Sequence, residues 1–247
     1  MSGRLAGRVA LVTGASRGLG AAIARRYAQE GAELILVART VGGLEEVDDA
    51  VQAAGGHATL VPLDLIDFAA LDRLGGAIFE RHKRLDVLVA NAGLLGSLTP
   101  LAHTDIKEWQ RVIDVNLTAN WRLIRSLDPL LRASPAGRAI FVTSAAGHAP
   151  RAYWGAYAVA KAALDQLALV YASEVEQTKL KVNLVDPGRL RTAMRAQAYP
   201  GEDPKTLLTP DAIVEVFVRL AEAGSQEHGQ RIAAQSLLAQ ERAGAKG

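Results

Sequence analysis

The feature of this sequence that most constrains its fold is the alternation of short apolar runs with longer amphipathic segments. Six runs are apolar and rich in β-branched residues, without alternation between polar and apolar positions. This pattern is typical of strands covered on both faces in a parallel sheet. The predicted strands are Val9–Thr13, Leu34–Ala38, Thr59–Pro62, Val87–Ala90, Ala139–Thr143 and Val182–Asp186.

Segments of helical character separate these runs. They span roughly residues 19–31, 42–54, 68–82, 105–133 and 153–177, and a last helix near 210–223 precedes a short strand near 231–235. In the first segment, Ile23, Tyr27 and Ala28 have the spacing of a buried helix face. Strands and helices that alternate in this way predict right-handed βαβ units in a doubly wound α/β sheet.

Length and composition narrow the class of protein. The 247 residues suit a single domain, residues 1–247, and 28 Lys+Arg against 26 Asp+Glu leave a net charge of only +2. We therefore expect no strong attraction to nucleic acid or anionic membranes. The chain has no cysteine and its five histidines lie far apart, so we expect no metal site. Without a membrane-spanning stretch or a signal peptide, a soluble cytoplasmic protein is predicted.

The stretch from residue 187 to residue 209 interrupts the alternating pattern. It contains three prolines and two glycines. Because a long loop inside a compact domain usually serves a function, we expect a lid over a binding site. The final residues, 241–247, are predicted to form a frayed tail.

A glycine-rich turn follows the first predicted strand. Residues 14–20 read Gly-Ala-Ser-Arg-Gly-Leu-Gly and lead directly into the first helix. Glycines at this place allow a tight turn and let a pyrophosphate approach the N–H groups of the helix start. The spacing differs from the general G-x-G-x-x-G fingerprint, and an ordinary βα turn is the alternative. Its position between the first strand and the first helix favours a dinucleotide site.

Two arginines bear on which dinucleotide binds. In NAD-binding proteins an acidic residue after the second strand accepts hydrogen bonds from the ribose 2′-hydroxyl. Here that strand is followed by Arg39, and no carboxylate comes before Glu45. Arg39 and Arg17, each of which alone would be an ordinary surface residue, together would form a fork around a 2′-phosphate. We therefore expect NADP(H) to be preferred over NAD(H).

Tyr157 and Lys161 are four residues apart in a helical segment, so they would lie on one helix face about 6 Å apart. A neighbouring ammonium lowers the pKa of a phenol, which suits it to proton exchange with an alcohol or carbonyl oxygen. Ser144 follows a predicted strand, at the edge where open α/β sheets place their sites. Taken singly, such a Tyr/Lys pair is common on surfaces, and Ser144 would be a helix or turn cap.

Together these motifs resemble the short-chain dehydrogenase/reductase family. The chain has TGASRGLG at 13–20, NAG at 91–93, Asn116, Ser144, YxxxK at 157–161 and PGxxxT at 187–192, in the order and spacing of that family. The resemblance covers residues 5–236, and residues 91–96, 154–161 and 191–204 are similar to an enterobacterial branch. It implies a single-domain Rossmann-type parallel sheet of about seven strands, in the order 3-2-1-4-5-6-7, with helices on both faces.

The resemblance also implies roles for individual residues. Tyr157 would be the general acid/base, and Ser144 would orient and polarise the substrate oxygen. Lys161 would bind the nicotinamide ribose and lower the pKa of Tyr157, while Asn116 would hold a water that links Lys161 to solvent. The implied cofactor-binding residues are Gly14, Ser16, Arg17, Gly18, Leu19, Gly20, Arg39, Asp64, Leu65, Asn91, Ala92, Gly93, Pro187, Gly188, Leu190 and Thr192, together with Tyr157 and Lys161. Asp64 would contact the adenine, or alternatively cap the helix that begins near Phe68.

The substrate wall should come from residues 94–98, 147–154 and 190–208. The expected substrate-binding residues are Leu94, Leu95, Trp154 and Met194, with Tyr199 nearby. These side chains favour an apolar or aromatic carbonyl compound. A carboxylate bound by Arg151, Arg191 or Arg195 is the alternative, although arginines in loops are usually solvated.

Two positions depart from the usual pattern of the family. Ala90 replaces the first of two asparagines, which leaves Asn91 in place. Asp186 precedes Pro187-Gly188, where a small or amide residue is more common. A carboxylate there would favour the oxidised nicotinamide, or it would simply point away.

The sequence thus predicts an NADP(H)-dependent oxidoreductase that acts on a small alcohol or carbonyl compound. The alternative from another class is a non-catalytic dinucleotide-binding protein that senses redox state or acts as a scaffold, but such a protein has no use for an activated tyrosine. Sugar epimerases and dehydratases also use YxxxK, usually on a longer chain. The resemblance implies a homodimer or homotetramer formed through the helices near 105–133 and 153–177.

Overall fold

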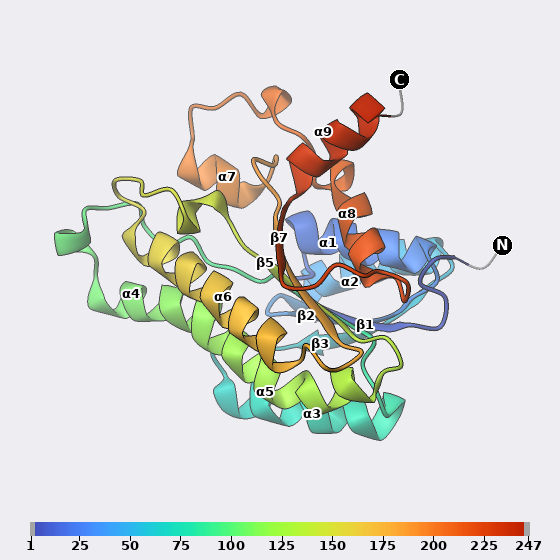
Figure 1. Ribbon diagram of the computed structural model, residues 1–247. Coiled ribbons are helices and arrows are strands. Elements are labelled where there is room, and N and C mark those ends of the chain that lie inside the picture. Colours follow the sequence, from blue (N-terminus) through green and yellow to red (C-terminus); the bar gives the residue numbers. More distant parts are fainter. Residues whose placement is uncertain (1–2, 245–247) are drawn as a thin grey trace.

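The structure, a computed structural model, describes residues 3–244 of the chain. Its centre is one parallel sheet with the strand order β3-β2-β1-β4-β5-β6-β7, which confirms the predicted topology (Figure 1). The strands are β1 Val9–Thr13, β2 Glu33–Ala38, β3 His57–Pro62, β4 Val87–Ala90, β5 Arg138–Val142, β6 Lys181–Asp186 and β7 Gln230–Ala233.

Helices cover both faces of the sheet (Figure 1). Those described are α1 Gly18–Gln29, α2 Val41–Ala53, α3 Phe68–His82, α4 Ile106–Ile113, α5 Ala119–Ala133, α6 Gly155–Glu174, α7 Ala193–Ala198, α8 Val214–Ala221 and α9 Ala234–Gly244. Residues of α1, α2 and α8 share one apolar core with the sheet, and residues of α3, α5 and α6 share the other. Successive residues of β1 enter opposite cores, as Leu11 and Val12 do, which explains why the strand is apolar throughout.

Several strands begin one or two residues earlier than predicted. All but one of the added residues are polar, and the clearest cases are Glu33, paired with His57, and Arg138, paired with Lys181. For β2, β5 and β6 the prediction began at the first apolar side chain, whereas a sheet ladder is made by the backbone and extends past it. The last strand was predicted near 231–235, but β7 ends at Ala233 and α9 follows directly.

Two predictions about helices need correction. The segment 105–133 is interrupted by a π-helical turn at Asp114–Thr118, where the side chain of Asn116 donates a hydrogen bond to the carbonyl of Val112 at 2.8 Å. The frayed tail predicted at 241–247 is wrong for its first part, because α9 continues to Gly244. Leu237 and Leu238 of α9 pack against the core, which anchors that helix. Residues 245–247 lie outside the described part of the chain.

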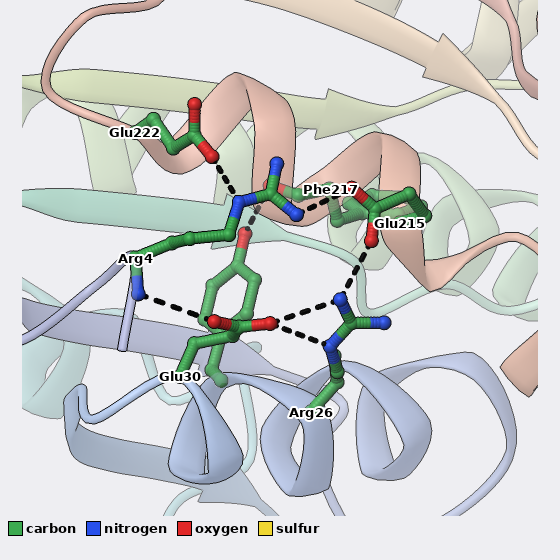
Figure 2. Close-up of polar contacts among 7 residues, drawn as sticks. Arg4, Arg26, Glu30, Glu215, Phe217 and Glu222 are labelled. Carbon is green, nitrogen blue, oxygen red and sulfur yellow. Dashed lines mark hydrogen bonds and ion pairs between the residues drawn. The ribbon is translucent and has the colours of Figure 1, made fainter. Parts of the chain in front are cut away.

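A network of charged residues joins the N-terminal segment and α1 to α8 (Figure 2). Arg4 donates hydrogen bonds to Glu222 and, at 2.5 Å, to Glu215. Arg26 lies 2.6 Å from Glu215 and 2.9 Å from Glu30. Glu215 therefore accepts hydrogen bonds from two guanidinium groups, and it links Arg4 of the N-terminal segment to Arg26 of α1.

A buried hydrogen bond joins the same two helices. Tyr27 of α1 is fully buried, and its hydroxyl donates to the carbonyl of Phe217 in α8 at 2.8 Å. Burial raises the pKa of Tyr27, so the hydroxyl keeps its proton and remains a donor. These contacts hold α8 on α1 and so fix the helix that begins at the glycine-rich turn.

We expect the charged network to weaken in acid. Partial burial raises the pKa of Glu215, but hydrogen bonds from Arg4 and Arg26 outweigh it and hold that pKa below its ordinary value of 4.5. A carboxyl whose pKa is lower in the folded state than in the unfolded state stabilises the fold at pH values above its unfolded-state pKa. This contribution is lost as the pH falls through its folded-state pKa. Glu215→Gln should therefore lower the thermal midpoint at neutral pH, and the difference from the wild type should shrink as the pH falls below 4.5.

The matched control is Glu45→Gln, which changes an exposed carboxyl on α2. The thermal midpoint of Glu45→Gln should equal that of the wild type at every pH from neutral to acid. A Glu215→Gln difference that stays constant from neutral to acid pH would contradict the role given to the charged network.

Candidate active site

The glycine-rich turn lies at the carboxyl end of β1, against the carboxyl end of β4. Gly14 has a φ of +65°, and a Cβ on it would lie 2.9 Å from the Cα of Ala92. A Cβ on Gly20 would lie 2.3 Å from the carbonyl oxygen of Gly14. Only glycine fits at these two positions, because the backbones approach too closely for any side chain.

The side chain of Asn91 fastens this turn to the sheet. Its amide nitrogen donates to the carbonyl of Thr13 at 2.8 Å and to that of Gly14 at 3.4 Å. In return, the Thr13 hydroxyl oxygen accepts the backbone N–H groups of Asn91 and Ala92, each at 3.0 Å. Sequence reasoning missed Thr13 as a structural partner, although it is the first residue of the TGxxxGxG pattern.

Arg17 and Arg39 are both exposed, and they follow the neighbouring strands β1 and β2. Arg39 lies 3.8 Å from the carboxylate of Asp64, which follows β3. Asp64 does not cap α3, because that role belongs to Asp67, whose side chain accepts from the N–H of Ala70. The structure thus removes the alternative reading of Asp64 and brings it beside Arg39.

The loop after β6 reaches back to the glycine-rich turn. Gly188 has a φ of +71°, and Leu190 is buried and bridged to Leu208. The hydroxyl of Thr192 accepts from the N–H of Arg195 and so caps α7, while its methyl group would lie 3.7 Å from a Cβ on Gly18. The predicted lid therefore contains a helix and meets the turn that starts α1.

Tyr157 and Lys161 share a buried face of α6, next to the end of β5. The ammonium of Lys161 donates to the carbonyl of Val142 at 2.7 Å and lies 5.8 Å from the centre of the Tyr157 ring. Ser144 caps a short turn by accepting from the N–H of Ala146, and it also forms a hydrogen bond with Tyr157. Ser144 therefore caps a turn, which was one of its predicted roles, and it also lies beside Tyr157.

The electrostatics of this pair differ from the expectation that Lys161 lowers the pKa of Tyr157. Burial raises the pKa of Tyr157 to about 12, the hydrogen bond with Ser144 acts in the opposite direction, and the charge of Asp186 adds to the rise. Burial also lowers the pKa of Lys161 to about 8, against the influence of Asp165 and Asp186. Burial is the largest influence on the pKa of Tyr157, and the ammonium of Lys161, whose own charge is disfavoured by burial, does not reverse it.

Asn116 is held rigidly in the π-helical turn. Its amide nitrogen donates to the carbonyls of Leu94 and Val112, both at 2.8 Å, and its oxygen accepts the N–H of Leu94 at 3.1 Å. A Cβ on Gly93 would lie 3.0 Å from that oxygen and 3.8 Å from Nζ of Lys161. The turn therefore brings Asn116, Gly93 and Lys161 together, and a Cβ on Gly93 would be tight against the Asn116 oxygen.

An apolar wall surrounds the tyrosine. Leu95 and Tyr157 are buried in one cluster, against which Leu94, Trp154 and Met194 pack. The ring of Trp154 lies 5.9 Å from those of both Tyr157 and Tyr199. All four predicted substrate-binding residues are thus brought to the same place.

Two of the three arginines considered for a carboxylate have other partners. Arg195 forms two hydrogen bonds to Glu202, at 2.5 and 2.6 Å, and its guanidinium stacks 3.7 Å from the centre of the Tyr199 ring. Arg151 donates to the hydroxyl of Tyr199 at 3.0 Å, and Arg191 is exposed. Sequence reasoning missed this link, in which Tyr199 joins the lid to the loop that carries Arg151.

Two further properties concern membranes and metals. Within residues 3–244, none of the helices is long and apolar enough to cross a membrane. The same residues contain no cluster of three or more histidine or acidic side chains that could hold a metal ion.

Comparison with known proteins assigns the class. The family described as short chain dehydrogenase matches residues 8–203. The uncharacterized oxidoreductase YciK of Escherichia coli is 40% identical, with 86% of this chain and 85% of that protein covered. The chain belongs to the short-chain dehydrogenase family and is an NAD(P)-dependent dehydrogenase/reductase.

Other relatives differ in what their names state. A yeast benzil reductase ((S)-benzoin forming) is 35% identical over 89% of this chain and 84% of its own length. An uncharacterized NAD-dependent oxidoreductase of Mycobacterium tuberculosis is 35% identical over 90% of this chain and 92% of its own. The crystal structure of a short chain dehydrogenase of Escherichia coli complexed with NADPH has a TM-score of 0.89 and 38% identity, covering 95% of this chain and 99% of that one.

The close approach at the glycine-rich turn makes a prediction about cofactor affinity. Gly14→Ala should weaken binding of NADPH and NADH by about tenfold or more, because the added Cβ needs the space occupied by Ala92. Gly42→Ala is the matched control, since nothing lies within 4 Å of its Cβ. Fluorescence titration of both variants measures the affinities, and equal values would contradict a diphosphate site at this turn.

Proposed function

We propose that this protein transfers a hydride between NADP(H) and a neutral apolar or aromatic carbonyl compound or its alcohol, with Tyr157 as the general acid/base. The observation that carries the proposal is the buried phenol of Tyr157 between Ser144 and Lys161, at the carboxyl edge of the sheet. Burial and a fixed hydrogen-bond partner are what a positioned proton donor requires.

The residues at this edge fit a nicotinamide dinucleotide. The glycine-rich turn packs closely on itself and on Ala92, which excludes side chains at Gly14 and Gly20, and it precedes the N-terminus of α1, which favours a diphosphate. The remaining contacts are assigned to the residues identified from the sequence: Ser16, Arg17, Gly18 and Leu19 at the phosphates, Arg39, Asp64 and Leu65 at the adenosine, Asn91–Gly93 beneath it, Lys161 at the ribose, and Pro187, Gly188, Leu190 and Thr192 at the carboxamide. When bound, the nicotinamide supplies or accepts the hydride.

The protein's own residues handle the proton. Because its pKa is raised, Tyr157 is protonated at neutral pH and donates its proton to the carbonyl oxygen during reduction. Ser144 holds the same oxygen, and Lys161 keeps a positive charge beside the phenolate that remains. To Asn116, which lies near Gly93 as Lys161 does, we assign the water that links Lys161 to solvent.

The apolar wall supports the substrate class. Leu94, Leu95, Trp154 and Met194 present no charge, while Arg151 and Arg195 are already engaged with Tyr199 and Glu202. A carboxylate on the substrate would have to displace these partners. The 35% identical benzil reductase, whose name specifies an aromatic diketone, supports the same class. We also propose that residues 187–209 act as the lid over this wall.

Tyr157→Phe tests the proton transfer. The variant should keep its NADPH affinity and lose about a hundredfold or more of its turnover with benzil, because no proton donor remains. Tyr171→Phe is the control, since it removes a phenol hydroxyl from the same helix, where that hydroxyl donates to Asp128. The loss of NADPH absorbance measures turnover, with a keto acid run beside benzil to test the substrate class. A Tyr157→Phe enzyme with nearly normal kcat would remove the proposed role.

The cofactor preference is supported by two observations. Arg17 and Arg39 offer two exposed guanidinium groups at the ends of β1 and β2, and a 38% identical relative is a complex with NADPH. The mycobacterial relative, named as NAD-dependent, shows that both cofactors occur among similar chains. In this chain the arginine pair favours the 2′-phosphate.

Arg39→Asp tests this preference. The ratio of kcat/KM with NADPH to that with NADH should fall by about tenfold or more, because a carboxylate repels the 2′-phosphate and accepts from the 2′-hydroxyl. Lys83→Asp makes the same change of charge at the exposed C-terminal end of α3 and should leave the ratio unchanged. Steady-state kinetics with an unaltered ratio in Arg39→Asp would refute the arginine fork.

The outer faces of α5 and α6 suggest the assembly state. Trp121, Leu169 and Val170 are exposed apolar side chains on these two helices. We propose that this surface pairs two copies of the chain in a homodimer or homotetramer, which light scattering of the purified protein tests.

A further inference from the structure

A second set of charged residues lies behind the catalytic pair. Asp165 is one helical turn beyond Lys161 on α6 and is almost completely buried. One of its carboxylate oxygens accepts from the hydroxyl of Thr143, and the other contacts Nε2 of His148 and lies 3.2 Å from Nε of Arg231. Buried carboxylates require such partners, because desolvation of an unpaired charge is costly.

Arg231 connects this carboxylate to the catalytic segment. It lies on β7, and its terminal nitrogen donates to the backbone carbonyl of Ser144 at 3.1 Å. The same nitrogen lies 3.6 Å from the carboxylate of Asp186, at the end of β6. One guanidinium therefore touches the segment after β5, the end of β6 and the middle of α6, which a compact ammonium cannot do.

Asp186 is in turn part of the loop assigned to the cofactor. Its other oxygen accepts the N–H of Gly188 at 2.9 Å. From α9, the side chain of Gln235 donates to the carbonyls of Pro187 and Arg189, at 3.1 and 2.9 Å. The C-terminal segment thus holds this loop from outside, and it lies beyond residue 203, where the match to the family ends.

The charges around the phenol of Tyr157 are few and nearly balanced. The charged and titratable groups that face it or its neighbours are Lys161 and Asp165 on α6, His148 after β5, Asp186 on β6 and Arg231 on β7. Asp186 raises the pKa of Tyr157 and of Lys161. Arg231 is the cation placed against Asp186, so it limits that influence.

We propose that Arg231 is a positioning residue of the active site, which fixes the Ser144 segment against Asp165 and neutralises Asp186 beside Tyr157. The proposal rests on the proposed function, since it assigns Arg231 to the same reaction. Arg231 touches no reacting atom. It acts through the place of the Ser144 backbone and through the charge that reaches the phenol.

The test combines three variants. Arg231→Gln should lower kcat for benzil reduction by about tenfold and move the alkaline limb of the pH profile upward by about one unit, because Asp186 is left without its counter-charge. Asp186→Asn should move the limb downward. The double variant should return the limb close to its wild-type position, since both charges are gone.

Two further variants separate charge from geometry and from folding. Arg231→Lys keeps the charge, so it should restore the pH profile while kcat stays reduced. Arg132→Gln on α5 removes an arginine bound to Asp128, away from the site, and should leave both quantities unchanged. Circular dichroism and NADPH titration establish that each variant is folded and binds the cofactor.

A readout without turnover is provided by ¹³C NMR of the labelled tyrosine ring carbons in the presence of NADP⁺. The signal of Tyr157 is identified by its absence in Tyr157→Phe, and its titration should shift in the same directions as the kinetic limb. If Arg231→Gln does not fold, Arg231→Lys decides, because a kcat equal to that of the wild type in this variant would contradict the positioning role.

A pH profile and an NMR titration that are unmoved in Arg231→Gln and in Asp186→Asn would overturn the inference about Arg231. That result leaves the proposed function intact, provided that Tyr157→Phe is inactive. Turnover that persists in Tyr157→Phe would instead overturn the proposed function itself.

Discussion

The constraint on which the rest of the structure depends is the close approach of backbone at the carboxyl ends of β1 and β4. At Gly14 and Gly20 there is no room for a side chain. The side-chain amide of Asn91 donates hydrogen bonds to the carbonyls of Thr13 and Gly14. Because the turn is fixed there, α1 begins with its N-terminus facing the edge of the sheet. Contacts with α8 hold α1 in this position, through the hydrogen bond of Tyr27 and the charged network around Glu215.

The second element of the site is the desolvation of a titratable pair. A buried phenol with a raised pKa retains its proton, and a buried ammonium with a lowered pKa is more easily discharged. Lys161 avoids an unpaired charge by bonding to the carbonyl of Val142, which also places it at the end of β5. The same contact that satisfies the ammonium therefore positions the lysine between the sheet and the tyrosine. The pKa of the phenol is set by burial first, by the hydrogen bond with Ser144 second and by the charge of Asp186 third.

The sequence predicted the sheet order, the strand positions and the edge at which the functional residues meet. The strand positions and the glycine-rich turn follow from local patterns, because apolar runs of β-branched residues and glycine turns are visible in consecutive residues. The sheet order was implied by the family resemblance. Strand starts such as Glu33 and Arg138 were missed, because the ladder depends on the backbone and the arginine is satisfied by distant carbonyls such as that of Ala223. The π-helical turn at Asn116 was missed for a similar reason, since it depends on contacts with Leu94, twenty-two residues away. The direction of the pKa shift of Tyr157 could not be predicted, because spacing along a helix carries no information about burial.

Residues after position 203 show why a family motif does not define a whole site. Arg231 and Gln235 come from β7 and α9, and both reach the loop that begins at Asp186. Neither has a local pattern that marks it, because a single arginine or glutamine near the end of a chain is ordinary. Their significance arises only when β7 pairs with β6 and brings the guanidinium level with the end of β5. An acidic residue at position 186 departs from the usual pattern of the family, and it is tolerable beside a phenol because the last strand supplies a cation against it. The departure and its compensation thus belong to one physical unit, although forty-five residues separate them in the sequence.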